Sequence, residues 1–274
     1  MKRKTSTPRT TGKKTARPIA LLTDFGLSDH YVGTMKGMIL SINPAATIVD
    51  ISHEVAPHDV LQGGYLLWAS YRYFPANTIY VSVVDPGVGG SRKIICVESG
   101  DRIFVAPDNG LLNFVLSREQ AQKGYEVHHP EHLISSPISS TFHGRDIFSP
   151  IAANLSLGKS IRTFGREFRM QTPRSPFYGP EAGLKVARIL HVDRFGNLVT
   201  NIPEKFFEDC ILGVGSTKIS RRIRNYQEAP PNEVCLIVGS NGLVEIVANA
   251  SRAAQILRAG LATPVTVLSS SRLK

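Results

Sequence analysis

Residues 78–87 read Thr-Ile-Tyr-Val-Ser-Val-Val-Asp-Pro-Gly, and this stretch decides the predicted fold class. Its β-branched and apolar residues predict a buried strand that ends at the Asp-Pro-Gly turn. Working outward, apolar runs at 18–22 and 46–51 predict two more strands. Helix-compatible spacing covers 31–42 and 60–71. The alternation of strand and helix predicts an α/β fold, with a mostly parallel sheet flanked by helices.

The pattern changes after a stretch rich in proline and glycine at 171–183. Beyond this stretch, short apolar segments alternate with turn residues, and only 251–258 has helical spacing. Further strands are predicted before this stretch, at 93–98 and 102–106, and after it, at 184–192, 234–238, 243–247 and 264–268. We therefore predict a tail at 1–18, an α/β domain at 19–170, a linker at 171–183 and a small β-barrel domain at 184–274.

The composition is that of a globular protein. Of the 274 residues, 42% are hydrophobic and 20% are charged, which is enough apolar material for a sizeable core. No uncharged apolar run approaches the roughly 18 residues that a membrane-spanning helix needs, so no membrane partner is expected. Cys96, Cys210 and Cys235 are odd in number and form no Cys-x-x-Cys pair. We therefore do not expect a disulfide framework. We expect a location in a reducing compartment, the cytoplasm.

The net charge of +10 is concentrated at the N-terminus. Seven of the first 18 residues are basic, whereas the remaining chain carries 25 basic and 22 acidic residues. We expect this tail to be disordered, and it lacks the apolar stretch of a secretory signal. A basic tail can attract nucleic acid or anionic lipid, or it can simply aid solubility. We favour a role of the tail in solubility. If nucleic acid is a partner at all, we expect the tail alone to bind it.

Polar residues follow the three predicted parallel strands. Asp24 follows the first strand, His53 and Glu54 follow the second, and Asp85 follows the third. Ligands of open parallel sheets bind at the carboxyl ends of the strands. Aspartate also caps turns and helices, but two such residues beside glycine at strand ends favour a binding site.

Several familiar motifs can be dismissed. Asp24-Phe25-Gly26 resembles the kinase magnesium triplet, but too few residues precede it for the rest of a kinase site. The glycines at 87–90 lack dinucleotide-binding spacing. The set His53, His58 and Asp59 matches no known spacing of metal ligands, so we predict no metal site.

Asp85, Arg92 and His143 form the most informative set. Asp85 and Arg92 flank a glycine-rich turn, so their side chains can face each other. His143 lies at 141–148, where polar groups alternate with apolar ones, as in a half-buried functional turn. A structural ion pair would explain Asp85 and Arg92, and a hydrogen-bonded core histidine would explain His143. Spacing alone does not decide between these interpretations.

Six segments stand out, in this order: Thr23–Gly26, Asp85–Gly89, Ala106–Gly110, Phe142–Phe148, Asp193–Asn197 and Gly239–Asn249. As an ordered set they resemble those of the S-adenosylmethionine (SAM) hydroxide adenosyltransferases, the hydrolase branch of the fluorinase and chlorinase superfamily. Each motif is weak alone, but the ordered set is specific, and the resemblance spans roughly residues 19–268.

The resemblance implies an α/β domain followed by a small β-barrel. It also implies a homotrimer, in which the substrate SAM lies between the N-terminal domain of one subunit and the C-terminal domain of its neighbour. The implied reaction is attack of water or hydroxide at the ribose C5′, which yields adenosine and methionine without a metal or cofactor. Whether the (R)-sulfonium epimer is preferred stays open.

The resemblance also assigns site residues. The set acting on water falls on Asp85, Arg92 and His143. Asp24 is placed to accept hydrogen bonds from the ribose hydroxyls. The remaining substrate contacts are Asp193 at the ammonium group, Asn197 at the adenine edge with Phe195 packed beside it, and Ser240, Glu245 and the backbone of Ala248 at adenine and methionine.

Two alternatives remain. A halide-using relative would lack the Asp–Arg–His set and often carries arginine where this chain has Asn241 and Ala248, which favours water here. A nucleoside-binding or nucleic-acid-binding module is the alternative from another class, and the small charge of the chain beyond the tail argues against it.

Overall fold

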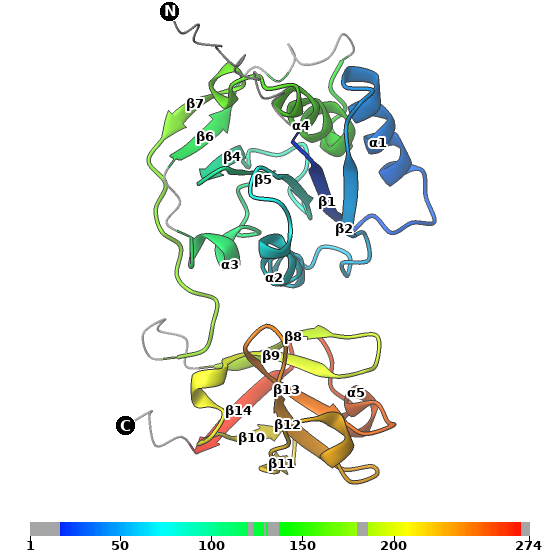
Figure 1. The fold of residues 1–274 in the computed structure, drawn as a ribbon, viewed down its shortest axis with the longest axis vertical. Coiled ribbons are helices and arrows are strands. Elements are labelled where there is room, and N and C mark those ends of the chain that lie inside the picture. Colours follow the sequence, from blue (N-terminus) through cyan, green and yellow to red (C-terminus); the bar gives the residue numbers. More distant parts are fainter. Residues whose placement is uncertain (1–16, 120–122, 129, 131–136, 180–185, 270–274) are drawn as a thin grey trace, which may run out of the picture.

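The computed structural model describes residues 17–119, 123–128, 130, 137–179 and 186–269 (Figure 1). The predicted tail therefore lies almost wholly outside the described residues, as does part of the predicted linker. Among the described residues, no helix is long and apolar enough to cross a membrane.

The N-terminal part of the described chain contains a seven-stranded sheet in the order β2-β1-β3-β5-β4-β6-β7. Three of its pairings are parallel, β1 with β2, β1 with β3 and β3 with β5, and the other three are antiparallel. The predicted sheet with helices is confirmed, and the antiparallel pairings of its second half make it a mixed sheet. The strands are β1 (Ile19–Thr23), β2 (Ile48–Ser52), β3 (Ile79–Val83), β4 (Ile94–Ser99), β5 (Arg102–Pro107), β6 (Lys123–Val127) and β7 (Gly165–Phe168).

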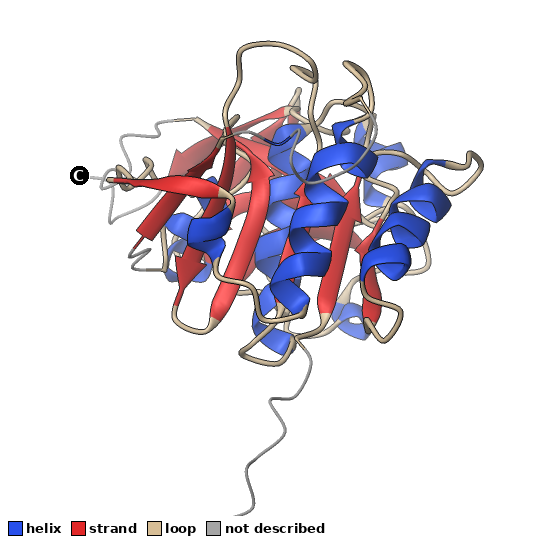
Figure 2. Cartoon of the chain, turned by 90° about the horizontal axis from the view of Figure 1, so that it is seen from above, coloured by secondary structure: helices blue, strands red, loops and turns tan. Residues whose placement is uncertain are grey.

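Helices cover both faces of this sheet, as Figures 1 and 2 show. On one face, α1 (Tyr31–Ile42) packs against α4 (Ser149–Ser156). On the other, α2 (Val60–Ser70) packs against α3 (Asn113–Leu116). Every residue of β1 and β3 is buried, as expected for central strands covered on both sides.

The C-terminal part is a seven-stranded antiparallel sheet in the order β11-β10-β14-β8-β9-β13-β12. It curls into a nearly closed barrel, because the backbone of Leu236 on β12 also bonds to Arg221 and Ile223, which follow β11. The predicted barrel is thus confirmed. Its elements are β8 (Ala187–Val192), β9 (Leu198–Pro203), β10 (Ile211–Val214), β11 (Thr217–Ile219), β12 (Val234–Val238), β13 (Leu243–Ala248), α5 (Ala253–Leu257) and β14 (Pro264–Ser269).

The barrel packs against the face of the sheet that carries α2 and α3 (Figure 1). Leu190, Val199 and Leu243 of the barrel belong to the same apolar cluster as the side chains of these helices. The ring of Phe177, just before the barrel, lies 4.9 Å from that of Trp68 on α2. This junction fixes how α2, and the loop before it, meet β8.

Candidate active site

A cavity of about 290 Å³ lies at the carboxyl ends of β1 and β3. Asp24, Asp85 and His143 all line it. Asp24 and Asp85 were selected from the sequence because ligands of open parallel sheets bind at the carboxyl ends of the strands, and both line this one cavity. The imidazole comes from the later segment at 141–144.

Arg92 links Asp85 to His143. Its Nε lies 2.9 and 3.0 Å from the two carboxylate oxygens of Asp85, and its Nη2 lies 2.6 Å from Oδ2. The same Nη2 lies 2.7 Å from Nδ1 of His143. The side chains of Asp85 and Arg92 are only 5% and 12% exposed, so this ion pair is shielded from water. The three predicted residues are thus one hydrogen-bonded chain.

The contact with Arg92 fixes the proton on the His143 ring. A guanidinium can only donate, so Nδ1 of His143 accepts and the ring proton is on Nε2. Burial, together with the positive charge of Arg92, lowers the pKa of His143 below its ordinary value of 6.5. The imidazole is therefore neutral at neutral pH and can donate through Nε2–H.

Two segments far apart in sequence form this chain of contacts. Gly89 adopts a left-handed φ of +75°, and a Cβ there would overlap the carbonyl oxygen of Ser140. The glycine-rich turn predicted at 87–90 thus lets the Asp85–Arg92 loop lie directly against the His143 segment. His143 then precedes a π-helical turn, Gly144–Phe148, which continues into α4.

Asp24, which follows β1, also lines the cavity, and its Oδ2 accepts from the backbone N–H of His58 at 2.8 Å. Three rings form an apolar wall: Phe142 lies 5.1 Å from Tyr31 and 6.0 Å from Phe25. Sequence reasoning did not select these rings as site residues. It likewise did not select the remaining lining residues, Pro57, His58, Val83, Val88, Thr141 and Gly144.

A second cavity, of about 580 Å³, lies on the barrel. Four predicted residues line it, namely Asp193, Phe195, Asn197 and Ala248. Tyr226 and Arg252 line it as well, and no strand-end or motif signal pointed to them. The Phe195 ring is 75% exposed, which is unusual for an aromatic side chain.

Asp193 and Asn197 support each other at the turn between β8 and β9. Asp193 Oδ1 accepts from the Asn197 backbone N–H, and Oδ2 accepts from its Nδ2, both at 2.8 Å. This pair uses one N–H of the Asn197 side-chain amide, which leaves its second N–H as a donor and its oxygen as an acceptor. This geometry is compatible with the adenine-edge contact that the resemblance implies for Asn197.

Ser240 and Glu245 do not line the barrel cavity. Ser240 is exposed in the turn between β12 and β13. Glu245 is buried at 8% exposure, and burial, followed by the nearby charge of Asp193, raises its pKa to about 7. A Cβ at Gly239 would overlap the Glu245 carboxylate, which explains glycine there.

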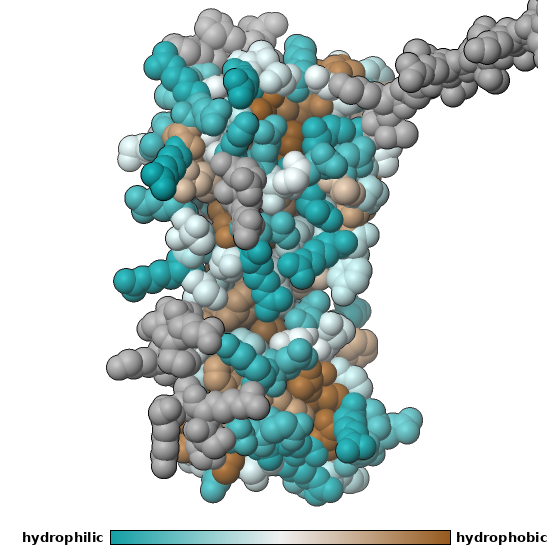
Figure 3. Space-filling model, turned by 60° about the vertical axis from the view of Figure 1, so that its left-hand side comes forward, coloured by the Kyte–Doolittle hydropathy of each residue, from teal (hydrophilic) through white to brown (hydrophobic). Residues whose placement is uncertain are grey.

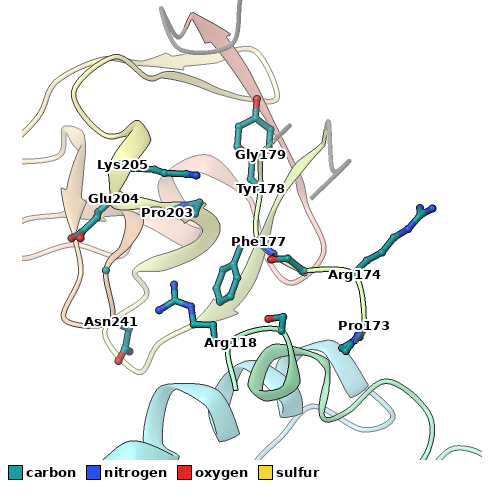
Figure 4. A pocket seen from close by; sticks show the side chains of 13 residues that line it. Arg118, Pro173, Arg174, Phe177, Tyr178, Gly179, Pro203, Glu204, Lys205 and Asn241 are labelled. Carbon is teal, nitrogen blue, oxygen red and sulfur yellow. The ribbon is translucent and has the colours of Figure 1, made fainter. Parts of the chain in front are cut away.

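The two cavities share no lining residue, so the described chain does not unite the predicted site in one place. A larger cavity, of about 1000 Å³, lies at the junction of the sheet and barrel (Figure 4). It contains Arg118, whose guanidinium carbon lies 4.8 Å from the centre of the Phe177 ring, and Asn241, but none of the predicted site residues.

One of the histidines near the first cavity, His53, has structural partners. His53 is buried, with Nδ1 at 2.8 Å from Thr23 Oγ1 and Nε2 at 3.1 Å from Asp50. Asp59 caps α2. Within the described parts of the chain, no group of three or more His, Cys, Asp or Glu side chains could hold a metal ion.

Comparison with known proteins agrees with both halves of this architecture. Residues 19–165 match the SAM hydroxide adenosyltransferase N-terminal domain, and residues 187–266 match the C-terminal domain. A protein of Salinispora arenicola described as an (R)-S-adenosyl-L-methionine hydrolase is 34% identical over 248 residues, which are 87% of this chain and 93% of that protein. A fluorinase of an Actinoplanes species is 28% identical over 71% of this chain and 74% of its own.

A solved structure supports the same grouping. The crystal structure of an uncharacterised conserved protein from Thermotoga maritima matches with a TM-score of 0.79 and 34% identity, covering 90% of this chain and 98% of that one. The chain belongs to the SAM hydroxide adenosyltransferase family.

Proposed function

We propose that this protein is a SAM hydrolase that converts the (R)-sulfonium epimer to adenosine and L-methionine. Its curated relatives at 32–34% identity are described as (R)-S-adenosyl-L-methionine hydrolases. The observation that carries the proposal is the hydrogen-bonded chain of Asp85, Arg92 and His143 beside the cavity that also holds Asp24.

In the proposed reaction, a water oxygen bonds to the ribose C5′ while the C5′–S bond breaks. The electron pair of that bond stays on the methionine sulfur, which loses its positive charge. Water has a pKa of about 15.7, so ionising it at pH 7 costs about 12 kcal/mol. Asp85 is the group that accepts the proton, and His143 donates through Nε2–H to the attacking oxygen.

Arg92 contributes positive charge and geometry in this proposal. It holds the Asp85 carboxylate with two nitrogens and fixes the His143 tautomer with one of them. Groups oriented in advance need not reorganise when charge develops, which is the main source of their effect on rate.

The substrate is proposed to lie between subunits of a homotrimer. In this arrangement, Asp24 of one subunit accepts hydrogen bonds from the ribose hydroxyls. The adenine and methionine parts are contacted by the neighbouring subunit, through its Asp193, Phe195, Asn197 and Ala248. Ser240 and Glu245 complete the barrel side. Separate cavities and exposed apolar side chains at each, Tyr31 at 39% and Phe195 at 75%, support this arrangement. Figure 3 shows apolar surface on both halves of the molecule.

We further propose a cytoplasmic location, which suits the free, buried thiols of all three cysteines. No cofactor is part of the proposed reaction, since SAM is the substrate and water the second reactant.

Chromatography of the purified protein incubated with each SAM epimer and EDTA tests this function. We expect adenosine and methionine together, formed faster from the (R) epimer. Parallel incubations with chloride or fluoride test the halide alternative, in which 5′-halo-5′-deoxyadenosine would accumulate instead. Absence of products from both epimers would overturn the proposal.

A further inference from the structure

The loop between β2 and α2 determines how Asp24 is held. Within it, His58 has a left-handed φ of +67°, which is uncommon and costly for a residue other than glycine. In this conformation its N–H points at the Asp24 carboxylate, 2.8 Å away. His58 and the neighbouring Pro57 also line the cavity. Something must therefore hold this loop in its strained shape.

Two side chains at the start of α2 hold the loop. Asp59 caps the helix by accepting from the Gln62 N–H at 2.8 Å. Gln62 Oε1 reaches back and accepts from the Ala56 N–H at 2.6 Å. The Gln62 side chain is buried at 6% exposure, so both ends of its amide need partners. The loop from 56 to 59 is thus fixed at each side of His58.

The second partner of Gln62 belongs to the barrel. Its Nε2 lies 2.9 Å from Nδ1 of His191 on β8. Because Oε1 already accepts from Ala56, the nitrogen must donate and His191 Nδ1 must accept. The ring of Tyr65 lies 5.8 Å from His191, and burial lowers the His191 pKa, so the imidazole is neutral and able to accept. His191 lies two residues before Asp193 of the barrel cavity.

We propose that Gln62 and His191 form an interdomain clamp that positions Asp24, through Ala56 and His58, for the ribose. Both are positioning residues, since neither lines the cavity. This inference rests on the proposed function, in which Asp24 binds the ribose hydroxyls. It assigns to the junction between sheet and barrel a role in substrate affinity rather than in the chemical step.

Kinetics of clamp variants with (R)-SAM test this role. Gln62→Leu removes both polar ends of the side chain, and we expect KM to rise about tenfold, equivalent to about 1.4 kcal/mol, with kcat changed less than about threefold. His191→Leu removes the acceptor and should behave alike. His191→Asn keeps an amide oxygen near the position of Nδ1 and should restore KM. An unchanged KM in both leucine variants would overturn the clamp.

Phe177→Leu is the matched control, because it loosens the same junction without touching the clamp. Phe177 packs on Trp68 and Phe114 at 4.9 and 5.4 Å. We expect it to lower Tm while KM stays at the wild-type value. A KM that rises equally in Phe177→Leu would show that junction packing alone sets affinity, and would overturn the specific role of Gln62.

Amide hydrogen exchange over residues 53–60 separates this inference from the proposed function, since it needs no turnover. Faster exchange in Gln62→Leu and His191→Leu, but not in His191→Asn or Phe177→Leu, supports the clamp even if the wild-type protein hydrolyses nothing. Unchanged exchange in both leucine variants overturns the clamp even if hydrolysis is confirmed.

Discussion

Glu245 is buried, although it lies on a strand where a solvated glutamate would be ordinary. Its 8% exposure and the nearby charge of Asp193 raise its pKa to about 7, from an ordinary value of 4.5. The folded protein therefore keeps a proton on this group over a pH range in which the unfolded chain releases it. Stability conferred by the neutral carboxyl is lost as pH rises from 4.5 through 7.

Glu245→Gln should remove this pH dependence. The amide has the same shape and no charge, so we expect the variant to equal wild type near pH 4.5 and to gain up to about 3 kcal/mol over it above pH 7. Urea unfolding at several pH values measures the difference. Glu208→Gln, at an exposed position, serves as control and should track wild type. Curves for Glu245→Gln that run parallel to wild type would contradict the burial argument.

Arg92 is expected to matter through the direction of its nitrogens as well as through its charge. Arg92→Lys keeps the charge but cannot hold Asp85 with two nitrogens and also donate to His143. We expect kcat to fall by about 10²–10³-fold, with adenosine affinity largely retained. Steady-state kinetics and adenosine titration measure the two quantities.

Arg145 offers a matched control for that change. It holds Asp146 through Nε at 2.6 Å and Nη2 at 2.9 Å, so it makes the same kind of pair two residues after His143. Arg145→Lys should reduce kcat far less than Arg92→Lys. Equal losses in the two variants would mean that packing of this segment, not the contact with His143, determines the rate.

At the scale of elements, the β3–β4 loop is the part that brings Asp85 and Arg92 of the proposed catalytic set against His143. Gly89→Ala should both strain the backbone and push the loop off Ser140. Gly100 has a similar φ of +57° with open space around it, so Gly100→Ala carries the conformational cost alone, about 1–2 kcal/mol. We expect Gly89→Ala to lose more stability and also kcat, whereas Gly100→Ala should retain kcat. Thermal unfolding and kinetics of the pair check this, and full activity of Gly89→Ala would contradict it.

Helices and strands with a clear periodicity of apolar residues were predictable from the sequence. Strands that depend on pairing with strands distant in sequence were not. The helix predicted at 31–42 coincides with α1, because its apolar spacing is a local signal. The strand β9 (Leu198–Pro203) was missed, although all but its last residue are buried, since its identity depends on pairing with β8 and β13. The antiparallel pairing of β4 with β5 was not predicted either, although both strands were. Their relative direction depends on the turn at Gly100.

For the molecule as a whole, the two separate cavities lead to a prediction about subunits. An Asp85→Asn chain lacks the sheet half of the proposed site, and an Asn197→Ala chain lacks the barrel half. When the two chains are co-expressed, about a quarter of the interfaces should regain activity, because each proposed site takes its two halves from different subunits. The control is co-expression of an Asp85→Asn chain with a His143→Ala chain. Both changes lie in the sheet half of the proposed site, so this mixture should stay inactive. Lack of recovery in the first mixture would contradict a shared site.

Part of the candidate site followed from the sequence because strand ends meet at one sheet edge, which places Asp24 and Asp85 together. The contact of Arg92 with His143 could not follow from spacing, since it depends on Gly89 lying against Ser140. His58 was weighed only as a metal ligand, and its contact with Asp24 was not predictable because it is made by the backbone N–H, which any residue except proline has.

The central claim is that water attacks C5′ under the control of Asp85, Arg92 and His143. Its most direct test is the mass of the adenosine formed from (R)-SAM in ¹⁸O-labelled water, compared between wild type and Asp85→Asn. We predict label in the 5′-hydroxyl of the wild-type product and a strongly reduced yield from the variant. Unlabelled adenosine, or labelled adenosine formed equally fast by Asp85→Asn, would contradict the account.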